Sequence, residues 1–131
     1  MTDTVLFVCP QGAGMSRIAA AWFNLVAPPG WHATSAGIQP QPQLGSNAPR
    51  LLAGTPAERL LDPEPPRPIS AITSLTCVVA ICCDVPDAER WDLTEREFTD
   101  GLRDEIRLRT EVLAGRCRQL EADDKLHESG A

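Results

Sequence analysis

The sequence predicts a single α/β domain built on a small parallel sheet. Apolar segments of strand type alternate along the chain with segments of helical periodicity, an order typical of strand–helix–strand units with helices on both faces of the sheet. The 131 residues, 43% of them hydrophobic, are enough to bury one modest core. We expect the domain to span residues 1–122 and the polar segment 123–131 to be a disordered tail.

The first unit is a strand over about residues 4–9 followed by a helix over about residues 16–27. The strand is apolar without interruption, and the helix repeats apolar residues at a spacing that marks a buried face: Ile18, Ala19, Trp22 and Val26. The run Pro28-Pro29-Gly30 ends the helix. A second short strand is predicted from Trp31, ending at Gly37.

The middle of the chain is rich in proline. Segment 40–68 holds most of the 12 prolines, so we expect loop with two short helices, over residues 46–53 and 57–61. Regular structure returns with an apolar run over residues 75–82, typical of a buried parallel strand, and a short strand near residues 90–92. A long helix is then predicted, with these apolar residues along one side: Phe98, Leu102, Ile106, Leu113, Cys117 and Leu120.

Composition and charge exclude several classes of function. The net charge of −6 and the lack of a basic stripe argue against nucleic acid as a partner. No apolar run is long enough to span a membrane, and the first residues lack the cationic flank of a signal peptide, so we expect a cytoplasmic protein. The five cysteines would then be reduced thiols. Neither they nor the two histidines show the spacing of a metal site, and we expect neither metal nor cofactor.

Cys9 is the most informative residue, because it ends a strand and opens a glycine-rich turn that leads into a helix. Backbone N–H groups in such a turn converge on one point, and the helix dipole adds to their positive potential. A cysteine here is often just a small core residue. However, core packing needs neither Gly12 nor Gly14, whereas close approach of a ligand to the backbone does. The pattern therefore predicts an anion held against a reactive Cys9.

Four stretches, in order along the chain, resemble the low-molecular-weight protein tyrosine phosphatases and the thioredoxin-coupled arsenate reductases. They are Val5 to Ser16 (similar to the strand and Cys-x5-Arg-Ser loop), Ser35 to Gly37, Val78 to Asp84, and Trp91 through the last helix. The resemblance implies a four-stranded parallel sheet in the order 2-1-3-4, which would bring Cys9 beside Cys82. It also implies that a small oxyanion (arsenate, phosphate or sulfate) is the ligand, with thioredoxin or another dithiol as reductant.

The resemblance assigns a role to each matching residue. Cys9 becomes the nucleophile and Ser16 the hydroxyl that stabilises its thiolate. Cys82 falls where the reductases carry a second redox cysteine, and a shift of one residue would select Cys83 instead. The amides that would cradle the oxyanion belong to Gln11, Gly12, Ala13, Gly14, Met15 and Ser16.

This chain departs from the family pattern at several positions. Met15 stands where the family has its loop arginine, and a thioether cannot replace a bidentate guanidinium. Arg17 lies nearby but should point off the helix rather than into the cradle. Gly12 replaces the loop asparagine. The general-acid aspartate of the phosphatases has no clear equivalent; Glu95 is the best match, and Asp92 the next.

Three functions remain open. The first is an arsenate-reductase-like enzyme in which Cys9 attacks the anion and Cys82 then forms a disulfide with Cys9; the cysteines at the strand ends favour it. Because Glu89 stands where the reductases have a third redox cysteine, Cys83 would take that role or the relay would end at one disulfide. The second is a phosphatase acting through a phosphocysteine, with Glu95 or Asp92 as the acid. The third is a non-catalytic anion- or protein-binding member, which Met15 favours.

Overall fold

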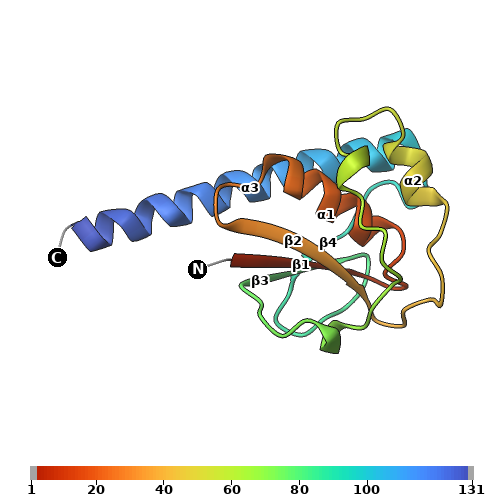
Figure 1. The fold of residues 1–131 in the computed structure, drawn as a ribbon, viewed down its shortest axis with the longest axis horizontal. Helices are drawn as coiled ribbons and strands as arrows, with labels where there is room; N and C mark the ends of the chain where they lie inside the picture. Colours follow the sequence, from red (N-terminus) through yellow and green to blue (C-terminus); the bar gives the residue numbers. More distant parts are fainter. Residues whose placement is uncertain (1–2, 130–131) are drawn as a thin grey trace.

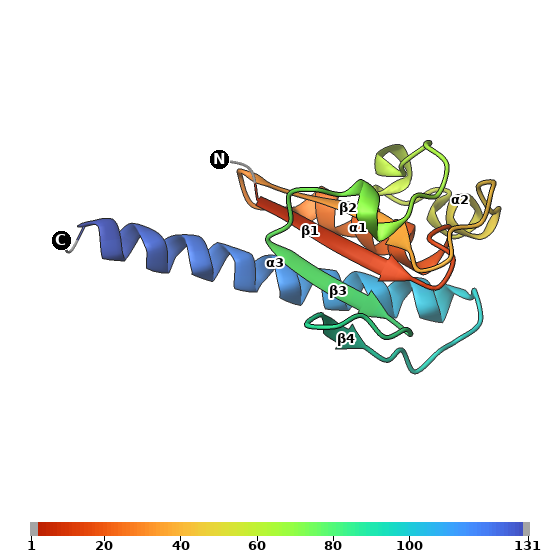
Figure 2. The same cartoon turned by 90° about the horizontal axis from the view of Figure 1, so that it is seen from below.

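Four parallel strands form one sheet, with the order β2-β1-β3-β4 that the family resemblance implied. The computed structural model describes the backbone of residues 3–129 and the side chains of residues 3–123. The strands are β1 (Asp3–Cys9), β2 (Trp31–Gly37), β3 (Cys77–Ile81) and β4 (Glu89–Trp91). Figure 2 shows them pointing the same way, with their carboxyl ends at one edge of the sheet. The predicted fold class is confirmed.

The strand register determines which residues meet at that edge. β1 pairs with β2 along its whole length, so that Cys9 lies opposite Gly37. On its other side β1 pairs with β3, and the last pair is Val8 with Ala80. Cys82 directly follows the end of β3. The central strand β1 therefore delivers Cys9 to a point flanked by the ends of β2 and β3.

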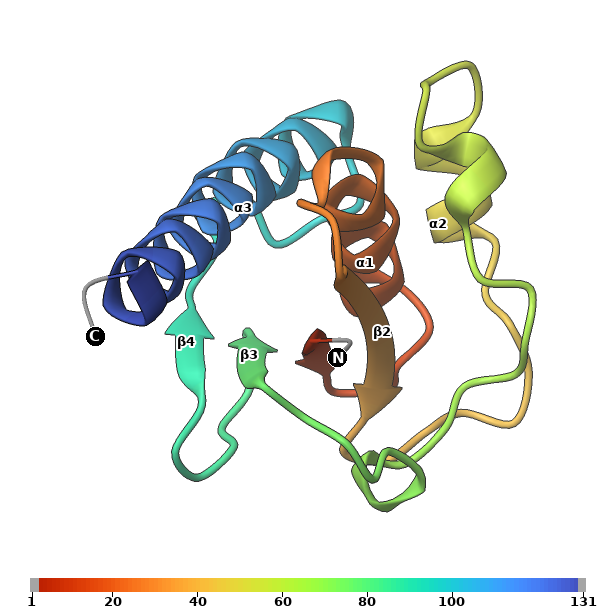
Figure 3. The ribbon, with the colours of Figure 1, turned by 60° about the vertical axis from the view of Figure 1, so that its left-hand side comes forward.

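One face of the sheet is covered by α1 (Met15–Val26) and α3 (Asp100–Ser129), as Figure 3 shows. The rings of Phe23 and Trp91 pack against Phe7, with centroids 6.1 and 5.5 Å away. Residues 16–23 of α1 are all buried, a wider face than the periodicity predicted, because α1 contacts α3, the sheet and the middle segment together. Val26, placed on the buried face by the periodicity, is only half-buried.

The other face of the sheet has a much smaller core. Leu6, Val8 and Ala36 are fully buried there, under Ile69, Ile72 and a few other apolar side chains. The helix on this face is a single 3₁₀ turn, η2 (Ile69–Ala71), which the sequence did not predict. Most of the stabilising apolar burial therefore lies on the α1 side.

The proline-rich segment forms α2 (Asn47–Leu52) and the 3₁₀ turn η1 (Glu58–Leu60), close to the two predicted short helices. Both lie near the N-terminal end of α1 (Figure 1). Leu51, Leu52 and Ala57 join the main core. The segment is thus anchored beside the loop that follows Cys9.

α3 begins at Asp100, two positions later than Phe98, because the Thr99 hydroxyl accepts a hydrogen bond from Leu102 N (3.3 Å) as an N-cap does. The predicted apolar stripe is buried at four positions: Leu102, Ile106, Leu113 and Cys117. Leu120 is 56% exposed, contrary to the prediction, because the end of α3 runs past the sheet (Figure 1).

The backbone is helical as far as Ser129, where the sequence predicted a disordered tail. Residues 130–131 lie outside the described residues, and the domain boundary at residue 122 stays a prediction. Within the described part of the chain, no helix combines the length and the apolar character needed to cross a membrane.

Candidate functional site

The loop between β1 and α1 is held by its carbonyl groups, which accept hydrogen bonds from the chain that follows β2. The pairs are Ile38 N to Cys9 O (3.2 Å), Gln39 N to Pro10 O (2.9 Å) and Gln41 N to Gln11 O (3.2 Å). The next carbonyl, that of Gly12, accepts from the side chain of Arg17, with Nε 2.9 Å from the oxygen. Four successive carbonyl oxygens therefore have donors outside the loop.

Two glycines make this close packing possible, so packing does require Gly12, contrary to the expectation from the sequence. Gly12 has a φ of 69°, in the left-handed region that favours glycine, and a Cβ on it would lie 2.7 Å from Gly37 N. A Cβ on Gly37 would lie 2.6 Å from the backbone of Gln11 and Gly12. Both contacts are backbone to backbone, so no side-chain rotation relieves them. The loop consequently lies directly on the end of β2.

The carbonyl bonds determine where the loop amides point. In a trans peptide unit the N–H points opposite to the C=O, so the amides of Gln11, Gly12 and Ala13 face away from the donors that hold the loop. Gly14, the N-cap of α1, has no side chain to satisfy the first amides of the helix. Among the described residues, no backbone N–H from Gln11 to Ser16 donates a hydrogen bond to the protein. This row of backbone amides, the nest, is of the kind that can hold an anion at a helix N-terminus.

The nucleophile and the hydroxyl assigned to it by the resemblance lie together. The Sγ of Cys9 is 3.0 Å from the Oγ of Ser16, and both residues are buried. Ser16 comes from the first turn of α1 and Cys9 from the end of β1, so the loop folds back to join them. A hydroxyl at this distance can donate to a thiolate and stabilise its charge.

The two adjacent cysteines after β3 pack on opposite faces of the sheet. Cys82 has a φ of 55°, which is uncommon for a residue with a side chain, and it packs on the α1 side, against the main core. Cys83 packs on the other side, with its thiol 3.5 Å from Val8 O. Burial raises the pKa of Cys83, as does the charge of Cys9. Cys82 therefore shares a face with Ser16, the partner of Cys9.

Position 15 contributes no charge to the nest, because methionine is uncharged. Met15 is half-buried and packs against the main core. Arg17, which the sequence placed pointing off the helix, donates to the Gly12 carbonyl and is not a surface residue: only 2% of it is exposed. Its Nη1 donates to Asp62 O at 2.8 Å. Arg67 in turn donates to the Asp62 carboxylate at 2.6 Å and to Ser35 O at 2.9 Å.

Sequence reasoning missed this network of Arg17, Asp62 and Arg67. One signal was present, because Arg17 lies in the first turn of an otherwise uncharged helix, where a cation is opposed by the helix dipole. Asp62 and Arg67 carried no signal, since both lie among prolines in a segment without periodicity. Together the three side chains tie the loop after Cys9 to the middle segment and to β2.

We expect Asp62→Asn to make the protein less stable at neutral pH and less sensitive to acid. Burial raises the pKa of Asp62, but the hydrogen bond from Arg67 and further polar contacts outweigh it and leave the pKa below its ordinary value of 3.8. A depressed pKa contributes stability that is present above the ordinary value and lost as the pH falls through the folded-state value. Urea unfolding from pH 7 to pH 3 should show a deficit of about 1 kcal/mol that shrinks in acid.

The matched control for that prediction is Glu64→Gln, which removes an exposed carboxylate two positions away. It should leave the free energy of unfolding nearly unchanged over the same pH range. An Asp62→Asn deficit that persists undiminished at pH 3 would show that the loss comes from packing rather than from the charge.

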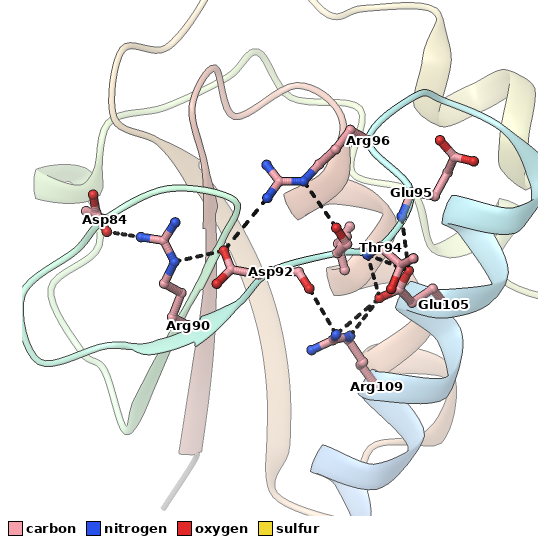
Figure 4. A network of polar contacts seen from close by, with 9 residues as sticks. Asp84, Arg90, Asp92, Thr94, Glu95, Arg96, Glu105 and Arg109 are labelled. Carbon is pink, nitrogen blue, oxygen red and sulfur yellow. Dashed lines mark hydrogen bonds and ion pairs between the residues drawn. The ribbon is translucent and has the colours of Figure 1, made fainter.

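Neither candidate acid makes a hydrogen bond or ion pair with residues 11–16 in the described part of the chain. The Asp92 carboxylate is exposed and pairs with Arg90 (2.8 Å) and Arg96 (4.0 Å), as Figure 4 shows. Glu95 accepts a hydrogen bond from Glu97 N at 3.1 Å. From the same segment, the ring of Phe98 reaches the loop and lies 2.6 Å from where a Cβ on Gly14 would be.

Other ion pairs in Figure 4 shape the segment that precedes α3. Glu105 accepts from Thr94 N (3.0 Å) and pairs with Arg109 (3.1 Å), while Arg90 also contacts Asp84.

Over the described side chains, no group of three or more His, Cys, Asp or Glu residues is placed so that it could hold a metal ion.

Solved structures with the same fold include two arsenate reductases and an arginine phosphatase. The arsenate reductase of Archaeoglobus fulgidus is 29% identical, with a TM-score of 0.68, over 85% of this chain and 98% of that one. The thioredoxin-dependent arsenate reductase of Corynebacterium glutamicum is 24% identical, with a TM-score of 0.65, over 92% of this chain and 63% of that one. The arginine phosphatase YwlE of Geobacillus stearothermophilus is 18% identical, with a TM-score of 0.69, over 92% and 96%.

A low-molecular-weight protein tyrosine phosphatase is also among the matching structures. Comparison with protein-family models finds no match, and comparison with curated proteins finds none either. The resemblance in the sequence is confirmed at the level of structure: the chain is similar to arsenate reductases and low-molecular-weight phosphatases, a family of cysteine-based oxyanion enzymes.

Proposed function

We propose that this chain, with the fold of the cysteine-based oxyanion enzymes, is an arsenate reductase that uses Cys9 as nucleophile and Cys82 as the resolving thiol. One observation carries the proposal. A row of backbone amides, from Gln11 to Ser16, makes no hydrogen bond within the described protein and borders a thiol that contacts the Ser16 hydroxyl. Amides in this arrangement bind a tetrahedral oxyanion and favour the thiolate beside it.

In the first step the Cys9 thiolate attacks the arsenic atom of bound arsenate. A sulfur–arsenic bond forms, and an arsenic–oxygen bond breaks, with the oxygen leaving as water after protonation. The amides of the loop hold the remaining oxygens and their negative charge. Ser16, which stabilises the thiolate before attack, stays beside the sulfur.

In the second step the Cys82 thiolate attacks Cys9 Sγ. The sulfur–sulfur bond forms as the sulfur–arsenic bond breaks, and its electron pair passes to arsenic, which leaves as arsenite. The two thiols have then supplied both electrons. A dithiol such as reduced thioredoxin restores Cys9 and Cys82 by exchange and becomes oxidised itself. We place the enzyme in the cytoplasm, as the sequence predicts, where such reductants are present.

The position of Cys82 supports its role as the resolving thiol. Disulfide formation requires Cα atoms within about 7 Å, a separation that residues at the ends of neighbouring strands can reach with a small movement. Cys82 follows the strand next to β1 and shares the α1 side with the partner of Cys9. Its left-handed φ of 55° is a strained conformation that a local rearrangement would relieve. Cys83, held against Val8 O on the opposite face, is the alternative.

The absence of a guanidinium at position 15 sets the expected level of activity. Losing a bidentate charge-assisted contact in a catalytic pocket costs about 10²- to 10⁴-fold in rate. We therefore expect slow turnover and weak binding of arsenate. The packing of Met15 into the core favours one further function, in which the nest binds an anion without chemistry.

A thioredoxin-coupled arsenate assay with Cys82→Ser and Cys83→Ser tests the proposal, each variant serving as the control for the other. We expect Cys82→Ser to lose repeated turnover by about 100-fold, because no thiol remains to release arsenite from Cys9. Cys83→Ser should keep most of the activity. The measurement is the steady-state rate at which NADPH is oxidised by the added thioredoxin and thioredoxin reductase.

Each other outcome identifies a different function. Activity lost in Cys83→Ser but kept in Cys82→Ser would exchange the roles of the two thiols. Hydrolysis of an aryl phosphate that survives Cys82→Ser, without arsenate reduction, would make the protein a phosphatase. Protection of Cys9 from alkylation by arsenate, with neither reaction observed, would leave a binding protein and overturn the proposal.

A further inference from the structure

Arg17 lies in an unfavourable place for a cation. Its side chain is 1% exposed, and it belongs to the first turn of α1, where the helix dipole opposes positive charge. A buried guanidinium is stable only when hydrogen bonds and opposite charge compensate for the lost water. The compensation that the structure offers therefore indicates what Arg17 does.

The first compensating contact is with the loop. Arg17 Nε donates to Gly12 O at 2.9 Å, and Gly12 is the residue with the left-handed backbone that lies against Gly37. Because a peptide unit is planar and trans, holding the Gly12 carbonyl on the Arg17 side directs the Ala13 N–H to the opposite side. Arg17 therefore holds the Gly12 carbonyl in the middle of the loop, as the backbone after β2 holds the carbonyls at the beginning of the loop.

The second compensating contact is with Asp62, and it leaves the group of Arg17, Asp62 and Arg67 with one net positive charge. Asp62 Oδ2 is 2.6 Å from Arg67 but 3.8 Å from Arg17, so the carboxylate is chiefly paired with Arg67. The two guanidiniums share one carboxylate, and Arg17 Nη2 is buried with no hydrogen-bond partner. Burial lowers the pKa of Arg17, whereas the negative charges of Asp62 and of Cys9 raise it. An arginine stays charged in spite of such burial.

We infer that Arg17 is a positioning residue that orients the oxyanion loop through the Gly12 carbonyl and supplies, from behind the loop, positive charge that Met15 does not provide. The inference rests on the proposed function for its substrate, but its central claim concerns anion binding and the reactivity of Cys9. A guanidinium behind the amides stabilises a bound anion and a thiolate without touching either.

Three substitutions separate the two parts of this role. Arg17→Met removes both the donor and the charge, Arg17→Gln keeps a donor without the charge, and Arg17→Lys keeps the charge without the fork. The matched control is Arg59→Met, which removes an exposed arginine of η1 that makes no hydrogen bond or ion pair among the described side chains. Circular dichroism and thermal melting establish which variants fold.

The readout is alkylation of Cys9 by iodoacetamide, followed by peptide mass spectrometry across pH 5–9, with and without inorganic arsenate. For Arg17→Met we expect alkylation about tenfold slower at pH 7, a pH profile displaced upward, and protection by arsenate about tenfold weaker. Arg17→Lys, which keeps the charge, should bring the pH profile closer to that of the wild type than it brings the protection by arsenate. Arg17→Gln, which keeps a donor, should bring the protection by arsenate closer to that of the wild type than it brings the pH profile. A purely structural role would lower the melting temperature and leave both readouts unchanged.

A folded Arg17→Met protein with the alkylation profile and arsenate protection of Arg59→Met overturns the inference. If Arg17→Met does not fold, the comparison of Arg17→Gln with Arg17→Lys decides in the same way. Failure of the proposed function is distinct. In that case the wild type reduces no arsenate, yet arsenate still protects Cys9 in a manner that depends on Arg17.

Discussion

Cys9→Ser should eliminate arsenate reduction, with a loss of about 10³-fold or more in the thioredoxin-coupled assay. A serine hydroxyl is not ionised at neutral pH and is a far weaker nucleophile than a thiolate. The exchange of one atom in a residue that is 3% exposed should preserve the fold. The melting temperature, measured by circular dichroism, should therefore change little while the activity disappears.

The control for this prediction is Cys117→Ser. Burial raises the pKa of Cys117 to about 11, so that thiol stays protonated and unreactive at neutral pH. The variant should keep its arsenate reductase activity and lose only some stability. Activity that persists in Cys9→Ser, or that disappears equally in both variants, would show that Cys9 is not the nucleophile.

Gly37→Ala is expected to have the largest effect among substitutions that touch no catalytic group. Its new Cβ would lie 2.6 Å from the backbone of the loop at Gln11 and Gly12, so the end of β2 and the loop must separate. We expect the free energy of unfolding to fall by about 2–3 kcal/mol in urea titrations. Arsenate protection of Cys9 should fall with it, because the loop amides lose their orientation.

Gly115→Ala is the matched control, since a Cβ on this exposed helical glycine meets nothing within 4 Å. It should raise the stability slightly, by about 0.5–1 kcal/mol, because alanine is the better helix residue. If Gly37→Ala retains wild-type stability and arsenate protection, the loop does not depend on its contact with β2.

The sequence predicted most of the fold because the relevant signals are local. The apolar strand ending at Cys9, the glycine-rich turn and the helix that follows are contiguous, and their order indicates an α/β unit with a candidate anion site. The contact of Cys9 with Ser16 was implied by the family resemblance rather than by this local order. Boundaries were less accurate, as at Phe98, where the Thr99 cap rather than the apolar pattern begins α3.

Predictions that depended on the environment of a side chain were less successful. Leu120 fits the apolar stripe of α3, but the sheet ends before the helix does, and nothing in the pattern records that length. The choice between Cys82 and Cys83 stayed open because a shift of one residue in the strand pairing would exchange them, and the apolar pattern does not set that register. Whether Glu95 acts as an acid likewise depends on how the segment before α3 is folded.

By itself, then, the sequence determined the order of elements, the parallel sheet and the thiol at its edge, since each depends on neighbouring residues. The tertiary structure decided how the loop is held. Its carbonyls are bound by residues 38–41 and by Arg17, and Arg17 is in turn held by Asp62, far along the chain. Contacts between distant segments form only when the sheet and the proline-rich segment pack together, and local sequence patterns carry no record of them.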